Sequence, residues 1–144
     1  MTTREMAPRL MVVDDHPEIL TLVERFSRQF GFEVTTRSGG VAALADVAQF
    51  RPDVMIVDIQ MPEVGGLEVL RAIRAVDPEC HVILMTGSPT IETAIDAVRL
   101  GALDYMIPDV AAPVVRQIIA AFARRYGRKP RVLDVGSSYG INAA

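Results

Sequence analysis

The sequence predicts an α/β fold in which a parallel sheet lies between two layers of helices, and three observations support this prediction. Short runs are apolar at every position, which is typical of strands buried on both faces of a sheet. Longer segments between them carry apolar residues at helical spacing. The two kinds of segment alternate almost to the end of the chain, which favours parallel strands joined by right-handed helical crossovers.

Five strands are expected from these apolar runs and from the turn residues beside them. The predicted strands are Leu10–Val13, Glu33–Thr36, Val54–Val57, His81–Met85 and Leu103–Ile107. The second is short and polar enough to be an edge strand, and Pro52 introduces the third.

Five helices are expected to alternate with the strands. They cover His16–Phe30, a segment after the Gly39-Gly40 turn, Leu67–Val76, a segment from Pro89 to Gly101, and a segment after Pro113. Proline suits a first helical turn and glycine suits a helix end, which fits Pro17, Gly31 and Gly101. The helical stripes are interpreted as core-facing; that of the fourth helix consists of Ile91, Ala94, Ile95 and Val98.

Composition limits the class of function. The chain has 144 residues, half of them apolar, which fits one domain with a short extension. The net charge of −3 gives no general argument for binding nucleic acid or membrane, and no apolar stretch is long enough to span a bilayer. The first residues lack the layout of a secretion signal, and a single cysteine, Cys80, fits a reducing compartment, so a cytoplasmic location is expected.

Polar residues directly follow three of the apolar runs. Asp14 and Asp15 follow the first run, Asp58 follows the third and Thr86 follows the fourth. Function in parallel sheets collects at the carboxyl ends of the strands, so these residues are expected to converge at one edge. Clustered carboxylates repel one another and raise one another's pKa, and Mg²⁺ is a common compensating ion for such a group.

Each of these residues also has a structural interpretation. Asp15 could cap the first helix, because Asp15 to Glu18 approximates a capping box. Asp58 could stabilise a turn, and Thr86 could open the fourth helix. Taken together these interpretations are weaker, since every one of the residues falls at the end of a predicted central strand.

The same residues lie in motifs that resemble the receiver domains of two-component response regulators. The motifs are Val12-Val13-Asp14-Asp15, Asp58 to Pro62 with Gly65-Gly66, Thr86-Gly87, and Gly101 to Tyr105. The resemblance covers roughly Pro8 to Tyr126. It implies a flavodoxin-like three-layer sandwich whose five-stranded parallel sheet has the order 2-1-3-4-5, and a receiver domain over residues 1–127.

The resemblance also implies roles for individual residues. Asp58 is expected to accept a phosphoryl group from a histidine kinase or phosphotransfer protein. Mg²⁺ is the implied cofactor, with Asp15 and Asp58 as ligands, Asp14 acting largely through water, and the backbone carbonyl of Gln60 as a further ligand.

A conformational switch is implied as well. Thr86 would hydrogen-bond the phosphoryl group and Tyr105 would rotate with it, which would reshape the surface of the fourth helix, fifth strand and fifth helix. That surface is the family's common homodimer face. The apolar stripe of the fourth helix could contribute to such a face or serve packing alone.

One part of the family pattern is missing. The family usually has a lysine and then a proline after the fifth strand, whereas this chain reads Ile107-Pro108-Asp109. The only lysine, Lys129, lies beyond the fifth helix. We therefore expect an intact acidic pocket with weaker stabilisation of the phosphoryl group. For the Ile107-Pro108 bond, trans is the expected default.

Residues 128–144 are predicted to be a basic linker and a disordered tail. The basic run is interpreted as a solvated helix end, because it is short and lacks interleaved aromatic residues, so no direct nucleic-acid binding is expected. The segment from Arg131 to Ala144 weakly resembles the first motif of S-adenosylmethionine-dependent methyltransferases. It could begin a truncated second domain, and no methyltransferase activity is expected.

The sequence is compatible with three functions. The leading interpretation is a phosphoacceptor signalling domain rather than a turnover enzyme. The second is a pseudo-receiver that binds partners without phosphorylation, which the missing lysine favours. The third, a metal-dependent phosphatase, would need an acid/base carboxylate where Gln60 stands. His16 could tune the pocket, but the sequence favours an exposed residue at a helix start, and His81 is expected to be structural.

Overall fold

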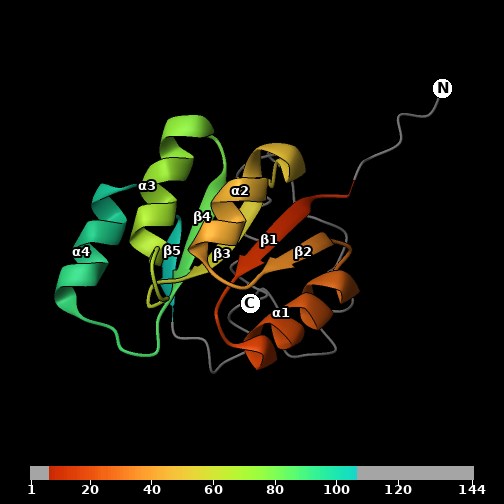
Figure 1. The fold of residues 1–144 in the computed structure, drawn as a ribbon, viewed down its shortest axis with the longest axis horizontal. Helices are drawn as coiled ribbons and strands as arrows, with labels where there is room; N and C mark the ends of the chain where they lie inside the picture. Colours follow the sequence, from red (N-terminus) through yellow and green to blue (C-terminus); the bar gives the residue numbers. More distant parts are fainter. Residues whose placement is uncertain (1–6, 107–144) are drawn as a thin grey trace, which may run out of the picture.

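The computed structural model describes residues 7–106, which form an α/β sandwich around a parallel sheet of strand order β2-β1-β3-β4-β5 (Figure 1). The strands are β1 (Arg9–Val13), β2 (Glu33–Arg37), β3 (Val54–Asp58), β4 (His81–Met85) and β5 (Asp104–Met106). The described helices are α1 (Pro17–Gln29), α2 (Gly40–Phe50), α3 (Gly66–Val76) and α4 (Ile91–Arg99). The parallel order is the predicted one. The predicted fifth helix, the Ile107-Pro108-Asp109 corner and the tail with its methyltransferase-like motif lie outside the described residues.

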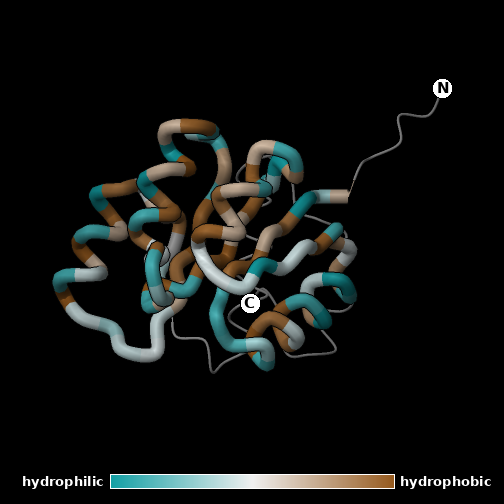
Figure 2. Tube along the Cα trace, viewed as in Figure 1, coloured by the Kyte–Doolittle hydropathy of each residue, from teal (hydrophilic) through white to brown (hydrophobic). Residues whose placement is uncertain are grey.

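The sheet separates two apolar clusters. On one face, α1 packs against alternate residues of the strands, including Leu10, Val12 and Ile56. On the other face, α2, α3 and α4 pack against the intervening residues, including Met11, Val13 and Val57. Figure 1 shows α1 on the opposite side of the sheet from α2 and α3, and in Figure 2 the most apolar stretches follow the central strands.

The central strands have no exposed side, which explains their uniform apolar sequence. Leu10 to Val13 of β1 and Val54 to Val57 of β3 are 0% exposed. Because successive side chains of a strand point to opposite faces, strands covered on both faces need apolar residues at every position. Since the helical layers cover both faces, the polar residues of these segments occur where the strands end.

Strand register brings those ends together. Val13 is paired with Val57 across β1 and β3, and Asp58 is paired with Met85 across β3 and β4. The residues that follow β1 and β4 therefore lie beside the last residue of β3, at one edge of the sheet. The sequence prediction of convergence at this edge is confirmed.

Gly66 allows the start of α3 to approach β3 closely. A Cβ atom at this position would lie 2.4 Å from the Asp58 carbonyl oxygen and 2.8 Å from the Ile59 Cα. The Gly66 amide donates to the Ile59 carbonyl at 3.0 Å, and the Gly65 amide donates to Glu68 Oε1 at 3.1 Å. The Gly65-Gly66 pair thus fixes the backbone directly behind Asp58.

The orientation of α4 differs from the predicted one. Its residue Ala97 is buried, whereas Ile91 and Val98 are 79% and 77% exposed and Ile95 is 45% exposed. Ala97 and Leu100 make the contact with the core, so the helix is rotated away from the expected stripe. The prediction that this stripe faces the core is wrong, and α4 presents a row of apolar side chains on its outer surface.

The ends of α1 and α4 decide two structural roles that the sequence left open, the capping of α1 by Asp15 and the opening of α4 by Thr86. The residue preceding α1 is His16, with no side-chain capping bond, so the described structure gives Asp15 no capping role. The residue preceding α4 is Thr90, whose side chain accepts from the Thr93 amide, so Thr86 does not open that helix.

None of the described helices has the length and apolar character needed to cross a bilayer.

Candidate functional site at the carboxyl edge of the sheet

Four side chains gather at the carboxyl ends of β1 and β3. They belong to Asp14, Asp15, His16 and Asp58, and each offers an oxygen or nitrogen atom within 4.8 Å of the others. The sequence predicted the three aspartates at this place. His16 is an addition to the predicted set, and the only sequence signal for it was its position next to Asp15.

Asp14 is the buried anchor of the group, with 2% of its surface exposed. Its Oδ1 accepts from the backbone amide of His16 and lies 2.9 Å from His16 Nδ1. Its own amide donates to the Arg37 carbonyl at 3.2 Å, which ties the end of β1 to β2. The carboxylate is therefore held in one orientation by backbone and side-chain contacts.

Asp58, the last residue of β3, is 8% exposed. Its Oδ1 accepts from the Gln60 amide at 3.1 Å, so the turn interpretation is correct in part and compatible with membership in the site. Burial raises the pKa of Asp58 to about 6, and the nearby carboxylates of Asp14 and Asp15 add to the rise against the Gln60 hydrogen bond. The site thus penalises the charged form of its central carboxyl group and favours a positive partner.

Asp15 is more open, with 30% of its side chain exposed. Its Oδ1 is buried and accepts no hydrogen bond among the described residues, although it lies 3.1 Å from His16 Nδ1. A buried carboxylate oxygen that accepts no hydrogen bond can bind a further ligand.

His16 is 62% exposed, as a residue at a helix start is expected to be, yet Nδ1 points toward the two acids. The hydrogen bond to Asp14 and the charge of Asp15 raise the pKa of His16. The prediction that the ring is exposed is confirmed, and Nδ1 also contacts the acids, which fits the alternative that His16 could tune the pocket.

Thr86 follows β4 at the same edge and is 1% exposed. Its Oγ1 accepts from the Ser88 amide at 3.0 Å, which holds the hydroxyl in the loop before α4. Gln60 follows β3 with an exposed side chain, and its amide is engaged by Asp58. The predicted role of the Gln60 carbonyl stays a prediction.

Tyr105 of β5 connects to the start of α4. Its hydroxyl lies 2.5 Å from Thr93 Oγ1 and accepts from the Thr90 amide at 3.3 Å. Thr90 and Thr93 also bond each other through their side chains. The ring, which packs against the cluster on the α2–α4 face, thus holds the first turn of α4 in place.

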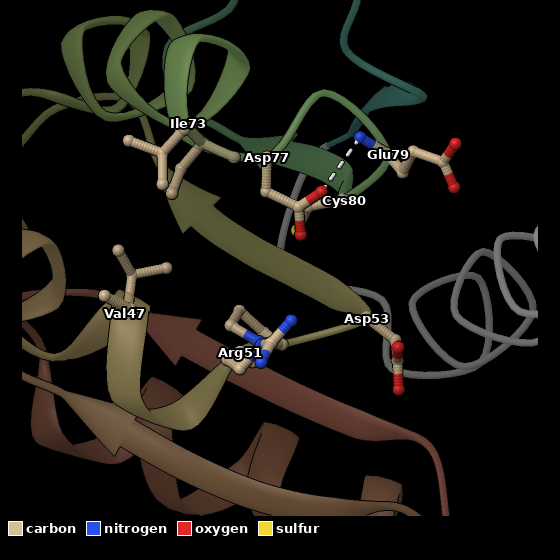
Figure 3. A pocket seen from close by; sticks show the side chains of 10 residues that line it. Val47, Arg51, Asp53, Ile73, Asp77, Glu79 and Cys80 are labelled. Carbon is tan, nitrogen blue, oxygen red and sulfur yellow. Dashed lines mark hydrogen bonds between the residues drawn. The ribbon is translucent and has the colours of Figure 1, made fainter.

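A separate cavity of about 490 Å³ opens at the opposite, amino end of β3 and β4 (Figure 3). Its lining residues are Val47, Ala48, Arg51, Pro52, Asp53, Ile73, Val76, Asp77, Glu79 and Cys80. Arg51 adopts a left-handed backbone conformation there, with φ of 54°. None of the predicted site residues lines this cavity.

A doubly wound parallel sheet with an acid-rich carboxyl edge defines a class of small α/β domain, and comparison with known proteins gives the family. The family model of the response regulator receiver domain matches residues 10–120. The chain therefore belongs to the receiver domains of two-component response regulators, as the sequence motifs indicated.

Individual relatives agree with this assignment. The transcriptional regulatory protein PrrA of Mycobacterium leprae is 36% identical over 126 residues, which is 87% of this chain and 54% of PrrA. A receiver domain protein structure from Clostridium thermocellum is 30% identical with a TM-score of 0.77, covering 83% of this chain and 97% of that one. A receiver domain structure from Methanospirillum hungatei, 23% identical, shares the fold with a TM-score of 0.81 over 85% of this chain and 98% of that one.

The chain spans about half the length of PrrA, the curated relative described above.

Proposed function

We propose that this domain is a signalling switch that accepts a phosphoryl group on Asp58 from a histidine kinase or phosphotransfer protein in the cytoplasm. The observation that supports this most is the position of Asp58: nearly buried at the end of β3, with donor atoms of Asp14 and Asp15 within 4.8 Å. A carboxylate so placed is held for reaction, and it is the family's phosphoacceptor position by its motif.

Mg²⁺ fits the donor set. The aspartates offer carboxylate oxygens, the Asp15 Oδ1 atom lacks a hydrogen-bond donor among the described residues, and burial penalises the charged form of Asp58. Asp15 and Asp58 would hold the ion directly, Asp14 through water, and the Gln60 carbonyl would complete the protein ligands. When bound, Mg²⁺ supplies positive charge beside the phosphoryl oxygens.

The protein's own residues supply the nucleophile and its orientation. One carboxylate oxygen of Asp58 forms the new P–O bond while the P–N bond of the donor phosphohistidine breaks and the imidazole leaves with the electron pair. The Gln60 amide holds Asp58 Oδ1, and the close contact of Gly66 fixes the backbone behind it. Because the acceptor is modified once per transfer, the domain acts as a switch rather than a turnover enzyme.

The response to phosphorylation would travel to α4. Thr86 follows β4 at the same edge as Asp58, and a phosphoryl group on Asp58 would offer the Thr86 hydroxyl an anionic hydrogen-bond acceptor. Movement of the loop that Thr86 anchors would act on Thr90, and through it on Tyr105. The exposed apolar row of α4 is the surface that would change, and it is the proposed contact for a second copy of the chain.

The absent lysine would weaken this response. A unit-charge pair at 4 Å is worth about 4 kcal/mol at an effective dielectric near 20, and solvent reduces that value at an open edge. Phosphorylation is therefore expected, with weaker stabilisation of the phosphoryl group or altered switching. A pseudo-receiver that binds its partner without phosphorylation is the second candidate, favoured by Ile107-Pro108-Asp109 at this corner of the sequence.

Labelling with acetyl phosphate and Mg²⁺, followed by intact mass, tests the proposal. The wild-type chain should gain one phosphoryl group, and Asp58→Asn should gain none. Chelation of the Mg²⁺ should abolish labelling, and Asp53→Asn provides a control at the far end of β3. Complete absence of labelling at high donor concentration, with Mg²⁺ binding intact, would leave the pseudo-receiver as the better description.

A further inference from the structure

The outer side of β2 forms an edge of the sheet. Among residues 7–106, β2 pairs with β1 and with no other strand (Figure 1). An edge strand presents backbone amides and carbonyls that can pair with a strand of another molecule. β2 contains no proline, so its backbone does not by itself prevent such pairing.

Two residues of β2 direct their backbone groups outward. The Glu33 amide donates at 2.9 Å to the carbonyl of the residue before β1, and the Arg37 carbonyl accepts at 3.2 Å from the amide of the residue after β1. Glu33 and Arg37 therefore face β1. Because alternate residues of a strand direct their amide and carbonyl to opposite sides, Val34 and Thr36 face away from β1.

Arginine side chains occupy both outward carbonyls. Arg28 Nη2 donates to the Val34 carbonyl at 3.0 Å, and Arg37 Nη1 donates to the Thr36 carbonyl at 2.6 Å. A second strand would need these same carbonyls as acceptors and would have to displace both guanidinium groups. Hydrogen bonds from a charged donor are stronger than those from a neutral amide, so this exchange is unfavourable.

An acid holds each arginine in place. Arg28 Nε donates to Glu24 of the same helix at 2.9 Å, and Arg37 Nε donates to Asp46 of α2. Since α1 and α2 cover opposite faces of the sheet, the edge is closed from both sides. We propose that Arg28 and Arg37 block the outer edge of β2 from pairing with a strand of a second copy of this chain. This role depends neither on phosphorylation nor on the outer surface of α4.

A second copy would fit the edge by twofold symmetry if the arginines were absent. In an antiparallel pair centred on Thr35, Val34 of one copy lies opposite Thr36 of the other, and each such pair exchanges two amide–carbonyl bonds. The alternative is that the arginines only tether α1 and α2 to the sheet. That alternative predicts a chain that is less stable but associates no more than before when the arginines are replaced.

Sedimentation equilibrium of the unphosphorylated full chain tests the proposal. Arg28→Met combined with Arg37→Met keeps the apolar stems and removes the donors. This double variant should dimerise at concentrations at least about tenfold lower than the wild type does, although its net charge is more negative than −3 and opposes association. The control Arg25→Met combined with Arg71→Met makes the same charge change at exposed positions of α1 and α3 and should associate like the wild type.

A proline in β2 distinguishes strand pairing from other association. Thr36→Pro, added to the double variant, removes an outward amide that β1 does not use, so it should restore the wild-type state of association. Thr36→Val keeps that amide and should leave the dimer intact. Hydrogen exchange of the Val34 and Thr36 amides in the double variant should slow as the protein concentration rises.

Arg28→Met alone keeps the test decisive if the double variant does not fold. The Arg28 side chain is 54% exposed, so its replacement preserves the core, and this variant should show a smaller increase in dimerisation with the same reversal by Thr36→Pro. Circular dichroism confirms that each variant is folded. Folded variants that associate no more than the wild type, or a dimer that survives Thr36→Pro, would overturn the proposal.

Discussion

Replacing Gly66 with alanine should destabilise the fold and disturb Asp58 at the same time. The added Cβ would lie 2.4 Å from the Asp58 carbonyl oxygen, 2.8 Å from the Ile59 Cα and 2.9 Å from the Asp58 carbonyl carbon. All three atoms belong to the backbone, so no side chain can rotate to make room. The start of α3 must move away from β3, or the end of β3 must bend.

The size of the effect follows from two opposing contributions. Overpacking costs about 1–3 kcal/mol, and rigid backbone neighbours place Gly66→Ala at the upper end. Alanine lowers the entropy of the unfolded chain, which offsets up to about 1 kcal/mol. We expect a net loss of about 2 kcal/mol, which lowers the urea midpoint by about 1 M for a typical denaturant slope near 1.5–2 kcal/mol/M.

Urea denaturation followed by circular dichroism measures this loss, with Gly87→Ala as the matched control. A Cβ at Gly87 meets nothing within 4 Å, so that variant should stay within about 0.5 kcal/mol of the wild type. Labelling by acetyl phosphate should also fall in Gly66→Ala under conditions where it is fully folded. Equal midpoints for the two variants would refute the argument that close approach at Gly66 positions Asp58.

Three further predictions concern single side chains. Asp58→Asn should stabilise the Mg²⁺-free chain at pH 7 by about 1–2 kcal/mol, because the folded state holds the Asp58 proton more tightly than the unfolded state does. The wild type loses the stability that this proton contributes as the pH rises from about 4 to about 6. The advantage of Asp58→Asn should therefore vanish near about pH 4, which thermal unfolding at several pH values measures. Tyr105→Phe removes the hydrogen bond to Thr93 and should lower the free energy of unfolding by about 1 kcal/mol in chemical denaturation. It should also speed hydrogen exchange in the first turn of α4, and unchanged exchange there would contradict the proposed coupling between Tyr105 and α4. Arg74→Met should cost about 1–3 kcal/mol by the same assay, since Arg74 donates to the Cys80 carbonyl at 2.6 Å and to the loop after α4, while Arg71→Met on the exposed side of α3 should be near neutral.

The strand ends were predictable from the sequence, and the reason is physical. A strand covered on both faces must be apolar at every position, so Asp14, Asp58 and Thr86, although buried themselves, mark the points where the apolar runs end. Parallel pairing then places these residues at one edge whatever the details of the helices. The central part of the fold and the acids of the site follow from this constraint.

The orientation of α4 was less predictable. Its sequence has small residues on one side and larger apolar residues on another, and only Ala97 is buried. A close helix–sheet contact can be made by a small residue, while Ile91 and Val98 remain outside. Hydropathy periodicity gives large apolar residues more weight than small ones, so it assigned the exposed row of α4 to the core.

Side-chain direction was the other limit. The pattern around Asp14 and Asp15 identified a site but could not show that His16 Nδ1 turns toward them, because this depends on the backbone at the start of α1. The contact of the Tyr105 hydroxyl with Thr93 likewise joins two segments whose spacing depends on how α4 rests on β5. Such contacts arise from tertiary packing and have no local sequence signature.

The acidic cluster is assembled from segments that are distant in the sequence, at the ends of β1 and β3. In an unfolded chain Asp58 is not near Asp14 and Asp15, so a ligand that needs all three cannot bind there. Any ion bound by the cluster therefore shifts the folding equilibrium toward the native state, by an amount that grows with the logarithm of its concentration above its dissociation constant. The midpoint of unfolding thus becomes a measure of metal occupancy, and the domain's stability in a cell depends on the ions around it.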